Sequence, residues 1–253
     1  MNRLPVVAVV IALAAAAQAR AVCLPDAVAS GPTCVDRYEA SVWSTKNPKL
    51  IRKIQAGAVT LTDLMAAGAV QHGVSSDDYG IGCPDDGQGC LSFYAVSIAG
   101  VPPSRFLTWF QAAAAARNSG KRLPTNAEWQ VAALGTPDSA PCVVSTGGTV
   151  PTGTPGCTSD VGAFDMVGNV DEWTADWVPL STDAPGWSFS FSDDFMGLAG
   201  ASVTGESVSG TFGPGAIIRG GDFSNGAGAG VFAVLGGNTP LDANDGSGFR
   251  CAR

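Results

Sequence analysis

The sequence predicts a loop-rich α+β domain with short strands, two clearly marked helices and long loops between them. Its 253 residues include 33 Gly and 16 Pro, yet 45% are hydrophobic, so frequent turns coexist with enough apolar material for a sizeable core. Two helix-start signals stand close together in the middle of the chain, and the other apolar runs are short. No internal repeat is visible, and we expect one domain.

The first 21 residues have the pattern of a secretory signal peptide. Arg3 gives a basic start, residues 5–17 are apolar, and Ala19–Ala21 form a small-x-small ending. The apolar run is short for a membrane span, although a retained anchor is the alternative. We predict cleavage after Ala21, a mature domain of residues 22–253 without membrane insertion, and a secreted, periplasmic or cell-surface location.

The charge balance is acidic, with a net charge of −8. Removing the predicted leader takes away two arginines and no acid, which leaves 12 basic and 22 acidic residues and a net charge of −10. Such a surface repels phosphate backbones and anionic lipids, so we expect no nucleic-acid partner. Acidic loops do suit calcium.

Seven cysteines in an exported chain make disulfides plausible. Six cysteines allow fifteen pairings, and short loop lengths favour Cys23–Cys34, Cys83–Cys90 and Cys142–Cys157. Cys251 is then unpaired and reads as a small buried hydrophobe. A metal role for the cysteines is weakly supported, because the chain has no C-x-x-C motif and only one histidine, His72.

The N-terminal half alternates short elements with loops. Residues 35–42 suit an early strand, 46–52 are basic and exposed, and 60–65 suit a short helix capped by Thr60, with Asp63 in its first turn. Residues 73–92 read as a loop closed by two cysteines, and 93–101 as a strand that ends at two prolines.

Two helices follow with strong start and stop signals. Thr108 and Gln111 have capping-box spacing before a run of alanines, and Gly120 ends that helix. Thr125 and Glu128 have the same capping-box spacing, before an apolar run that stops at Gly135. These helices are expected to be scaffold.

The second half is mostly loop. Residues 136–160 and 178–215 have no clear period, and the latter contains aromatic residues that we expect to anchor it: Trp187, Phe189, Phe191 and Phe195. The last stretch, 217–253, opens on a β-type run, turns at Gly220-Gly221 and closes on a possible strand at 248–251. Arginines stand at both of its ends, so we interpret it as an ordered, loop-rich surface that is fixed at its two ends.

Few residues are candidates for catalysis or metal binding. Four acids lie around Asn169, and their oxygens suit calcium, although turn and capping roles explain them slightly better: Asp165, Asp171, Glu172 and Asp176. Paired carboxylates for glycoside hydrolysis are also conceivable there. A nucleophilic triad or pair would need His72, for which an ordinary loop or strand-edge role is the simpler interpretation.

Four segments in order resemble the formylglycine-generating-enzyme (sulfatase-modifying factor) domain family: TWFQAAAAARNSGKRLPTNAEWQVAA, GAFDMVGNVDEWTADW, IIRGGDF and GFRCAR. The resemblance implies a C-type-lectin-like fold with a small twisted antiparallel sheet and two helices. It also implies a structural calcium ion bound by Gly168, Asn169, Val170 and Glu172.

The same resemblance speaks against the family's oxidase chemistry. Sulfatase-modifying members carry two copper-binding cysteines, five residues apart, where this chain has Asn225 and Gly230. Relatives that form carbon–sulfur bonds at iron use several histidines, which are also missing. We therefore expect no copper, no iron and no catalytic residue of either known set.

The C-terminus also resembles the variable proteins of diversity-generating retroelements, which present their terminal region as a binding face. The resemblance implies a protein or glycan ligand held by surface positions Asp222, Ser224, Asn225, Leu235, Asn238, Leu241, Asp242, Asn244 and Asp245. We predict an exported, non-catalytic binding protein. The alternatives are a family enzyme with an unassigned active site and a structural envelope protein.

Overall fold

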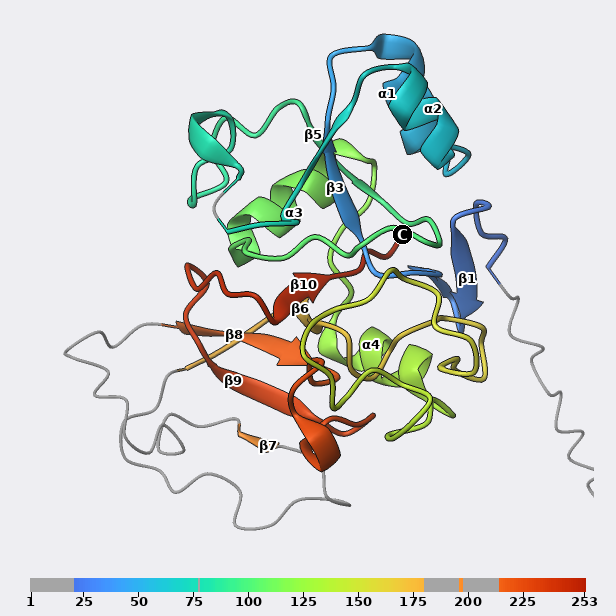
Figure 1. Ribbon diagram of the computed structural model, residues 1–253, viewed down its shortest axis with the longest axis vertical. Helices are drawn as coiled ribbons and strands as arrows, with labels where there is room; N and C mark the ends of the chain where they lie inside the picture. Colours follow the sequence, from blue (N-terminus) through green and yellow to red (C-terminus); the bar gives the residue numbers. More distant parts are fainter. Residues whose placement is uncertain (1–20, 77, 180–195, 198–213) are drawn as a thin grey trace, which may run out of the picture.

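The computed structural model describes residues 21–76, 78–179, 196–197 and 214–253 (Figure 1). The predicted signal peptide, except its last residue, and the four predicted aromatic anchors lie outside these residues. In the part of the chain that is described, no helix is both long and apolar enough to cross a membrane.

The described elements confirm a mixed α+β architecture, with four α-helices among them. The first half contains β1 (Ala27–Ser30), β2 (Thr33–Asp36), β3 (Ser41–Ser44), α1 (Pro48–Gln55), α2 (Leu61–Ala66), β4 (Val70–His72), the 3-10 turn η1 (Gly80–Gly82) and β5 (Phe93–Val96). The second half contains α3 (Trp109–Asn118), α4 (Asn126–Ala133), β6 (Asp171–Pro179), β7 (Met196–Gly197), β8 (Pro214–Arg219), η3 (Gly226–Gly228), β9 (Val234–Asn238) and β10 (Ser247–Phe249).

The strands form three small sheets. β1 and β2 form an antiparallel pair, and β3 lies between β4 and β5 in a second antiparallel sheet. The third has the order β10-β6-β8-β9-β7 and is mixed, because β10 pairs with β6, and β7 with β9, in parallel. In Figure 1, α3 lies between the second and third sheets, while α1 and α2 cover the far end of the second.

Both predicted capping boxes are present. The Thr108 hydroxyl accepts from the Gln111 N–H while the Gln111 side chain accepts from the Thr108 N–H, and Thr125 and Glu128 do the same at α4. Thr60 caps α2 with Asp63 in the same arrangement. Such a box satisfies two N–H groups that a helix start leaves free.

Two strands predicted from the sequence have wrong boundaries. The strand predicted at 35–42 is split into β2 and β3, because the backbone N–H groups of residues 38 and 40 bond instead to Ser97 Oγ and to the carbonyl of Phe249. The strand predicted at 93–101 ends at Val96. Residues 46–52 are mostly exposed, as predicted, but they also contain the start of α1, which was not predicted.

The core of the described residues has four parts. One lies between α3 and the largest sheet and includes Trp173, Phe249 and Leu107. A second surrounds Trp129 of α4. The third packs α1 and α2 against β3 and β5. The fourth surrounds the cysteines Cys142 and Cys157. The structure contains the three predicted disulfides, Cys23–Cys34, Cys83–Cys90 and Cys142–Cys157, and it buries Cys251 as a free thiol.

Candidate functional site

The start of the C-terminal stretch is fixed to α4 by Arg219, which is buried at the end of β8. Its guanidinium donates to the side chains of Asn126 (2.6 Å) and Gln130 (2.5 Å) and lies over the Trp129 ring, 4.5 Å from the centroid. It also donates to the carbonyls of residues 231 and 233, so it closes the loop that follows β8 onto the helix.

The other end of the stretch is fixed by Arg250, which is fully buried. Its Nε and Nη2 bond both carboxylate oxygens of Glu172 on β6, at 2.5–2.8 Å. The remaining donors reach the backbone carbonyls of Asp36 and Phe164. Trp129 Nε1 donates to the same carboxylate at 2.7 Å, so one tryptophan contacts the anchors of both ends.

A second buried charge network ties the last residue to the N-terminus. Arg253 pairs with Asp26 at 2.9 Å, and the ammonium of Lys121 lies 2.7 Å from both Asp26 and Asp36. Burial raises the pKa of Asp36, against the pull of Lys121. Burial also opposes ionisation of Asp26, but its two cationic partners outweigh that cost and hold its pKa below the usual value.

All nine residues predicted to bind a ligand reach the surface. Five are exposed, namely Ser224, Asn225, Leu241, Asn244 and Asp245. The others, Asp222, Leu235, Asn238 and Asp242, are half-buried. The stretch therefore presents these side chains outward from a base that the buried arginines hold in place.

Local hydrogen bonds shape the two loops that carry most of these residues. Asp222 Oδ1 accepts from the N–H and hydroxyl of Ser224, and Asn225 Oδ1 accepts from the Asp222 N–H. In the second loop, Asp242 accepts from Thr239, and Asn244 accepts from the N–H of residue 246. The loops are thus ordered by their own polar side chains.

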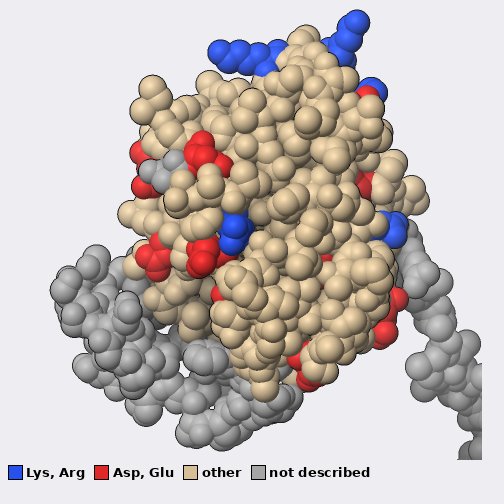
Figure 2. Space-filling model, viewed as in Figure 1, with Lys and Arg blue, Asp and Glu red and all other residues tan. Residues whose placement is uncertain are grey.

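The second loop also rests on the segment that leads into α3. Arg105 donates to the carbonyl of Asp245, the Phe106 N–H to that of Asn244, and the Trp109 N–H to that of Pro240. Figure 2 shows acidic groups close to a single basic group on the side where this loop lies. The second loop itself carries two acids, Asp242 and Asp245, and Arg105 is the cation bonded to its backbone.

The two loops meet at Asp222 and Gly246. A Cβ atom at residue 246 would lie too close to Asp222 Oδ2, so a larger residue there would require the Asp222 carboxylate to move. Beside this junction is a cavity of about 120 Å³, lined by Asp171, Asn225 and Leu235 among others. Burial, the nearby charge of Asp222 and that of Glu172 raise the pKa of Asp171 well above its usual range, despite a bond from the Gly221 N–H.

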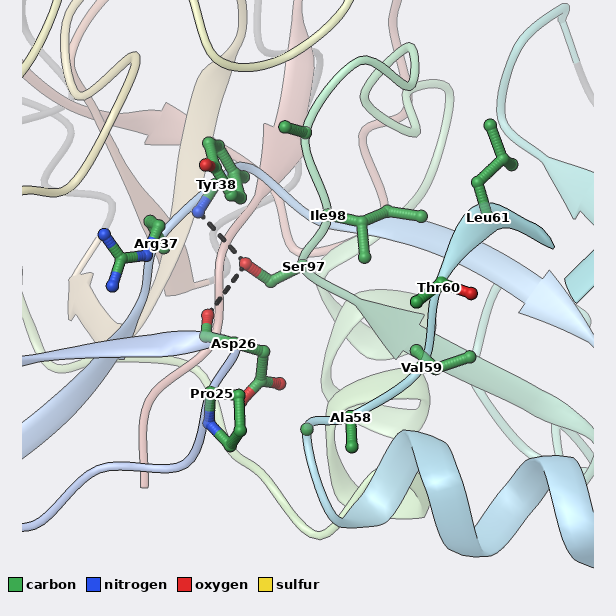
Figure 3. A pocket seen from close by; sticks show the side chains of 12 residues that line it. Pro25, Asp26, Arg37, Tyr38, Ala58, Val59, Thr60, Leu61, Ser97 and Ile98 are labelled. Carbon is green, nitrogen blue, oxygen red and sulfur yellow. Dashed lines mark hydrogen bonds between the residues drawn. The ribbon is translucent and has the colours of Figure 1, made fainter. Parts of the chain in front are cut away.

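A separate and larger groove, about 560 Å³, lies between the N-terminal segment, the α1–α2 connection and the end of β5. In Figure 3, Ser97 stands between its walls, accepting from the Tyr38 N–H and donating to the Asp26 carbonyl, while the Arg37 guanidinium points away from Ser97. None of the residues predicted to bind ligand or metal lines this groove.

The model of one family, "Sulfatase-modifying factor enzyme 1-like domain", matches residues 69–147 and 146–253. The chain belongs to this family. No curated protein sequence matches it.

Solved structures resemble this sulfatase-modifying-factor-like chain at low identity. The Major Tropism Determinant I1 Variant is 18% identical, with a TM-score of 0.50 over 92% of this chain and 54% of that one. CarF is 17% identical (TM-score 0.44, 89% and 87%), and Treponema denticola variable protein 1 is 18% identical (TM-score 0.38, 59% and 70%). The chain spans about half the length of the Major Tropism Determinant structures. The first of these likenesses places the fold among C-type-lectin-like domains.

Calcium, which the family resemblance implies, does not fit residues 168–172 as they are folded. Both oxygens of Glu172 are bonded to Arg250, and Asn169 Oδ1 accepts from the Val150 N–H. Asn169 Nδ2 donates to Glu39, which also accepts from the Val170 N–H. The described residues contain no group of three or more His, Cys, Asp or Glu placed to hold a metal ion. The comparisons do not test the predicted calcium ligands Gly168, Asn169, Val170 and Glu172, and the contacts of Asn169 and Glu172 oppose calcium binding there.

Two important residues were not singled out from the sequence. Trp129 was assigned to scaffold, and its contacts with both ends of the C-terminal stretch depend on residues 43 and 90 positions away. Asp171 was counted among the acids, but the cavity that it lines is formed with β8 and β9, which supply Ile218 and Leu235. His72 bonds the carbonyl of Asp78 and the hydroxyl of Ser44, which agrees with the simple strand-edge role.

Proposed function

We propose that this sulfatase-modifying-factor-like protein is exported and non-catalytic, and that it binds a protein or glycan ligand on its C-terminal loops. Membership of the family supports only the fold, because one fold can serve many functions. The proposal therefore rests on the site itself.

The observation that carries it is the contrast between the outside and the base of the stretch. None of the nine candidate residues is buried, whereas Arg219 and Arg250 beneath them are. Asn238 and Asp245 have no side-chain hydrogen bond within the described structure, and Leu241 is 57% exposed. Unengaged polar groups and an exposed leucine on a fixed loop are what a binding surface requires.

The cavity supports the absence of oxidase chemistry. Asn225 lines it, where the resemblance places the first copper-binding cysteine, and Gly230 is buried nearby in the same loop. The remaining thiol, Cys251, is buried, and burial raises its pKa well above the usual value. A protonated, enclosed thiol is a poor nucleophile and a poor metal ligand.

One observation favours the alternative that this is an enzyme. Asp171 lines the cavity with a raised pKa, and such a carboxyl can keep a proton to donate to a substrate. This alternative requires a turnover that Asp171→Asn abolishes in a protein that still folds.

Binding can be tested on a printed glycan array and on a panel of purified surface-protein ectodomains. We expect at least one saturable ligand whose binding is lost in a Leu241→Asp, Asn244→Ala double variant. Lys49→Ala, an exposed change on α1, is the matched control and must bind normally. Absence of any ligand, or equal binding by the loop variant, would overturn the proposal.

The non-catalytic part has its own test. Incubation with a sulfatase-type cysteine peptide, copper and oxygen should leave the cysteine unchanged by mass spectrometry. Formation of formylglycine would contradict it. Relation to a retroelement is a question for the neighbouring DNA, where a near-copy of the last codons differing at adenines beside a reverse-transcriptase gene would support diversification.

A further inference from the structure

A hollow of about 370 Å³ lies between α3 and the loop closed by the Cys83–Cys90 disulfide. None of the nine residues assigned to ligand binding lines it, although the N–H of Trp109 in its wall donates to the carbonyl of Pro240, next to Leu241. One wall comes from α3 and includes Trp109, Phe110 and Arg117. The opposite wall is formed by residues 86–91. Its volume is in the range of sites for small molecules.

The hollow is preformed, because the disulfide loop is tied to α3 at both ends. Gln111 Nε2 donates to the carbonyl of Cys83 at 2.8 Å, and Thr108 Oγ1 donates to that of Asp85 at 2.6 Å. At the other end of the helix, Asn118 Nδ2 donates to the carbonyl of Cys90 at 2.6 Å. Little ordering entropy is then lost when a ligand enters.

One end of the hollow is aromatic. Trp109 and Phe110 are both partly exposed, and their rings meet edge to face with centroids 5.4 Å apart. Trp177 contacts both rings, at 5.0 and 5.8 Å. Trp109 Nε1 donates to the Thr174 carbonyl, which fixes the orientation of the indole. Rings held in this way offer a rigid apolar surface.

The rim carries three different polar groups, all exposed: the carboxylate of Asp86, the amide of Gln88 and the guanidinium of Arg117. Asp86 Oδ1 accepts from the Gln88 N–H, which holds it in place. No described residue forms an ion pair or hydrogen bond with the Gln88 amide or with the Arg117 guanidinium. Donors and acceptors are therefore both available at the rim.

We propose that this hollow is a second binding site, which holds a neutral pyranose unit of a glycan. A pyranose ring has an apolar C–H face that stacks on aromatic rings, and a fringe of hydroxyls that both donate and accept. The aromatic residues Trp109 and Phe110 would contact the C–H face of the sugar. The polar groups of Asp86, Gln88 and Arg117 would bond its hydroxyls. The rim carries one carboxylate, Asp86, and one guanidinium, Arg117, and we therefore limit the proposal to an uncharged sugar.

The inference does not depend on the C-terminal loops being a binding surface. The experiment is saturation-transfer NMR on the full mature protein with methyl glycosides of glucose, galactose, mannose and N-acetylglucosamine. We expect transfer to the ring protons of at least one, with weak affinity. Gln88→Ala and Arg117→Ala should each weaken it about tenfold, as expected for a lost hydrogen bond to an amide or a charged group.

Two further variants locate the sugar. Phe110→Ala should abolish transfer to the ring protons, and Leu241→Asp should leave it unchanged. Phe110 is only partly buried, and circular dichroism with a urea titration shows that each variant is folded. No transfer from any of the four glycosides, equal transfer in the rim variants, or loss only in Leu241→Asp would each overturn the proposal.

Discussion

Arg250 and Glu172 form an ion pair that has no contact with solvent, with Arg250 Nε 2.6 Å from Glu172 Oε2. The two residues lie on neighbouring parallel segments, since Gly248 of β10 is opposite Glu172 of β6. Their pairing therefore fixes the last segment of the chain beside β6, at one edge of the largest sheet. Together with Arg219, this pair attaches the two ends of the region between β8 and β10 to the rest of the fold.

Removing the arginine should be strongly destabilising. Arg250→Met leaves the Glu172 carboxylate buried without its cation, and such changes cost about 3–5 kcal/mol. Urea unfolding monitored by tryptophan fluorescence measures the loss. The double variant Glu172→Gln, Arg250→Met keeps an acceptor for Trp129 Nε1 and should recover most of it. Equal instability of the double and single variants would show that the loss is not due to the unpaired charge.

These attachments mark the limit of what the sequence could reveal. The helices α3 and α4 were predictable because their capping residues lie three positions apart, within one turn. Arginines at the two ends suggested fixation, but their partners are distant in the chain: Glu172 is 78 residues from Arg250, and Gln130 is 89 from Arg219. A periodic pattern in the sequence relates only residues that are close along the chain, so it cannot reveal such pairs.

Other misses have local causes. Only Leu50 and Ile54 are buried in α1, so its apolar stripe is too narrow to stand out within a basic segment. β9 has the sequence VLGGN, whose glycines have low strand propensity, and its pairing with β8 overrides that preference. The disulfides were predictable because each closes a short loop.

Stability should decrease as the pH rises above about 4.5, because of Glu39. Burial, together with the carboxylates of Asp165 and Glu172, raises the pKa of Glu39 well above its ordinary value of 4.5, although Arg250 opposes this. Between the two pKa values the folded state holds a proton that the unfolded chain has lost, so the free energy of unfolding falls with rising pH by up to about 1.4 kcal/mol per pH unit.

Glu39→Gln removes this titration and should flatten that part of the profile. The check is a series of urea titrations from pH 4 to 8 on wild type and variant. Asp36 and Asp171 also have raised pKa values and leave a residual slope in both proteins, so the difference between the two curves is the relevant quantity. If stability changed with pH in the same way in wild type and in Glu39→Gln, the pH dependence would have to come from other groups.

Glu128 should show the opposite dependence. Its bonds from the Arg122 guanidinium lower its pKa to about 2, and the Thr125 N–H and Thr33 hydroxyl add to this effect. Its contribution is present above pH 4.5 and is lost as the pH falls toward 2. Because the pair is partly exposed, Glu128→Gln should cost only about 0.5–1 kcal/mol at pH 7. The cost should vanish near pH 2, and a constant cost would argue against ionisation as its source.

The disulfide Cys142–Cys157 should stabilise the loop that supports the first ligand-binding loop. The pair is 15 residues apart, and the Gly226 N–H donates to the carbonyl of Val144 inside it. Replacing both cysteines by serine should cost about 3 kcal/mol, the value that chain entropy gives for a loop of this length. Chemical denaturation measures it, and the same double change at Cys83 and Cys90 is a comparison with a shorter loop.

Calcium gives the last prediction. The guanidinium of Arg250 already neutralises Glu172 and collects the carbonyls of Asp36 and Phe164, so a calcium ion would have to displace a buried cation. We therefore expect the same melting temperature in calcium as in chelator. A ligand that binds only the native state must raise it. A rise would restore the ion to residues 168–172, and the variant Asn169→Ala would then show whether that loop holds it. A rise that persists in this variant would place calcium elsewhere, for instance near the acidic loops of the C-terminal face.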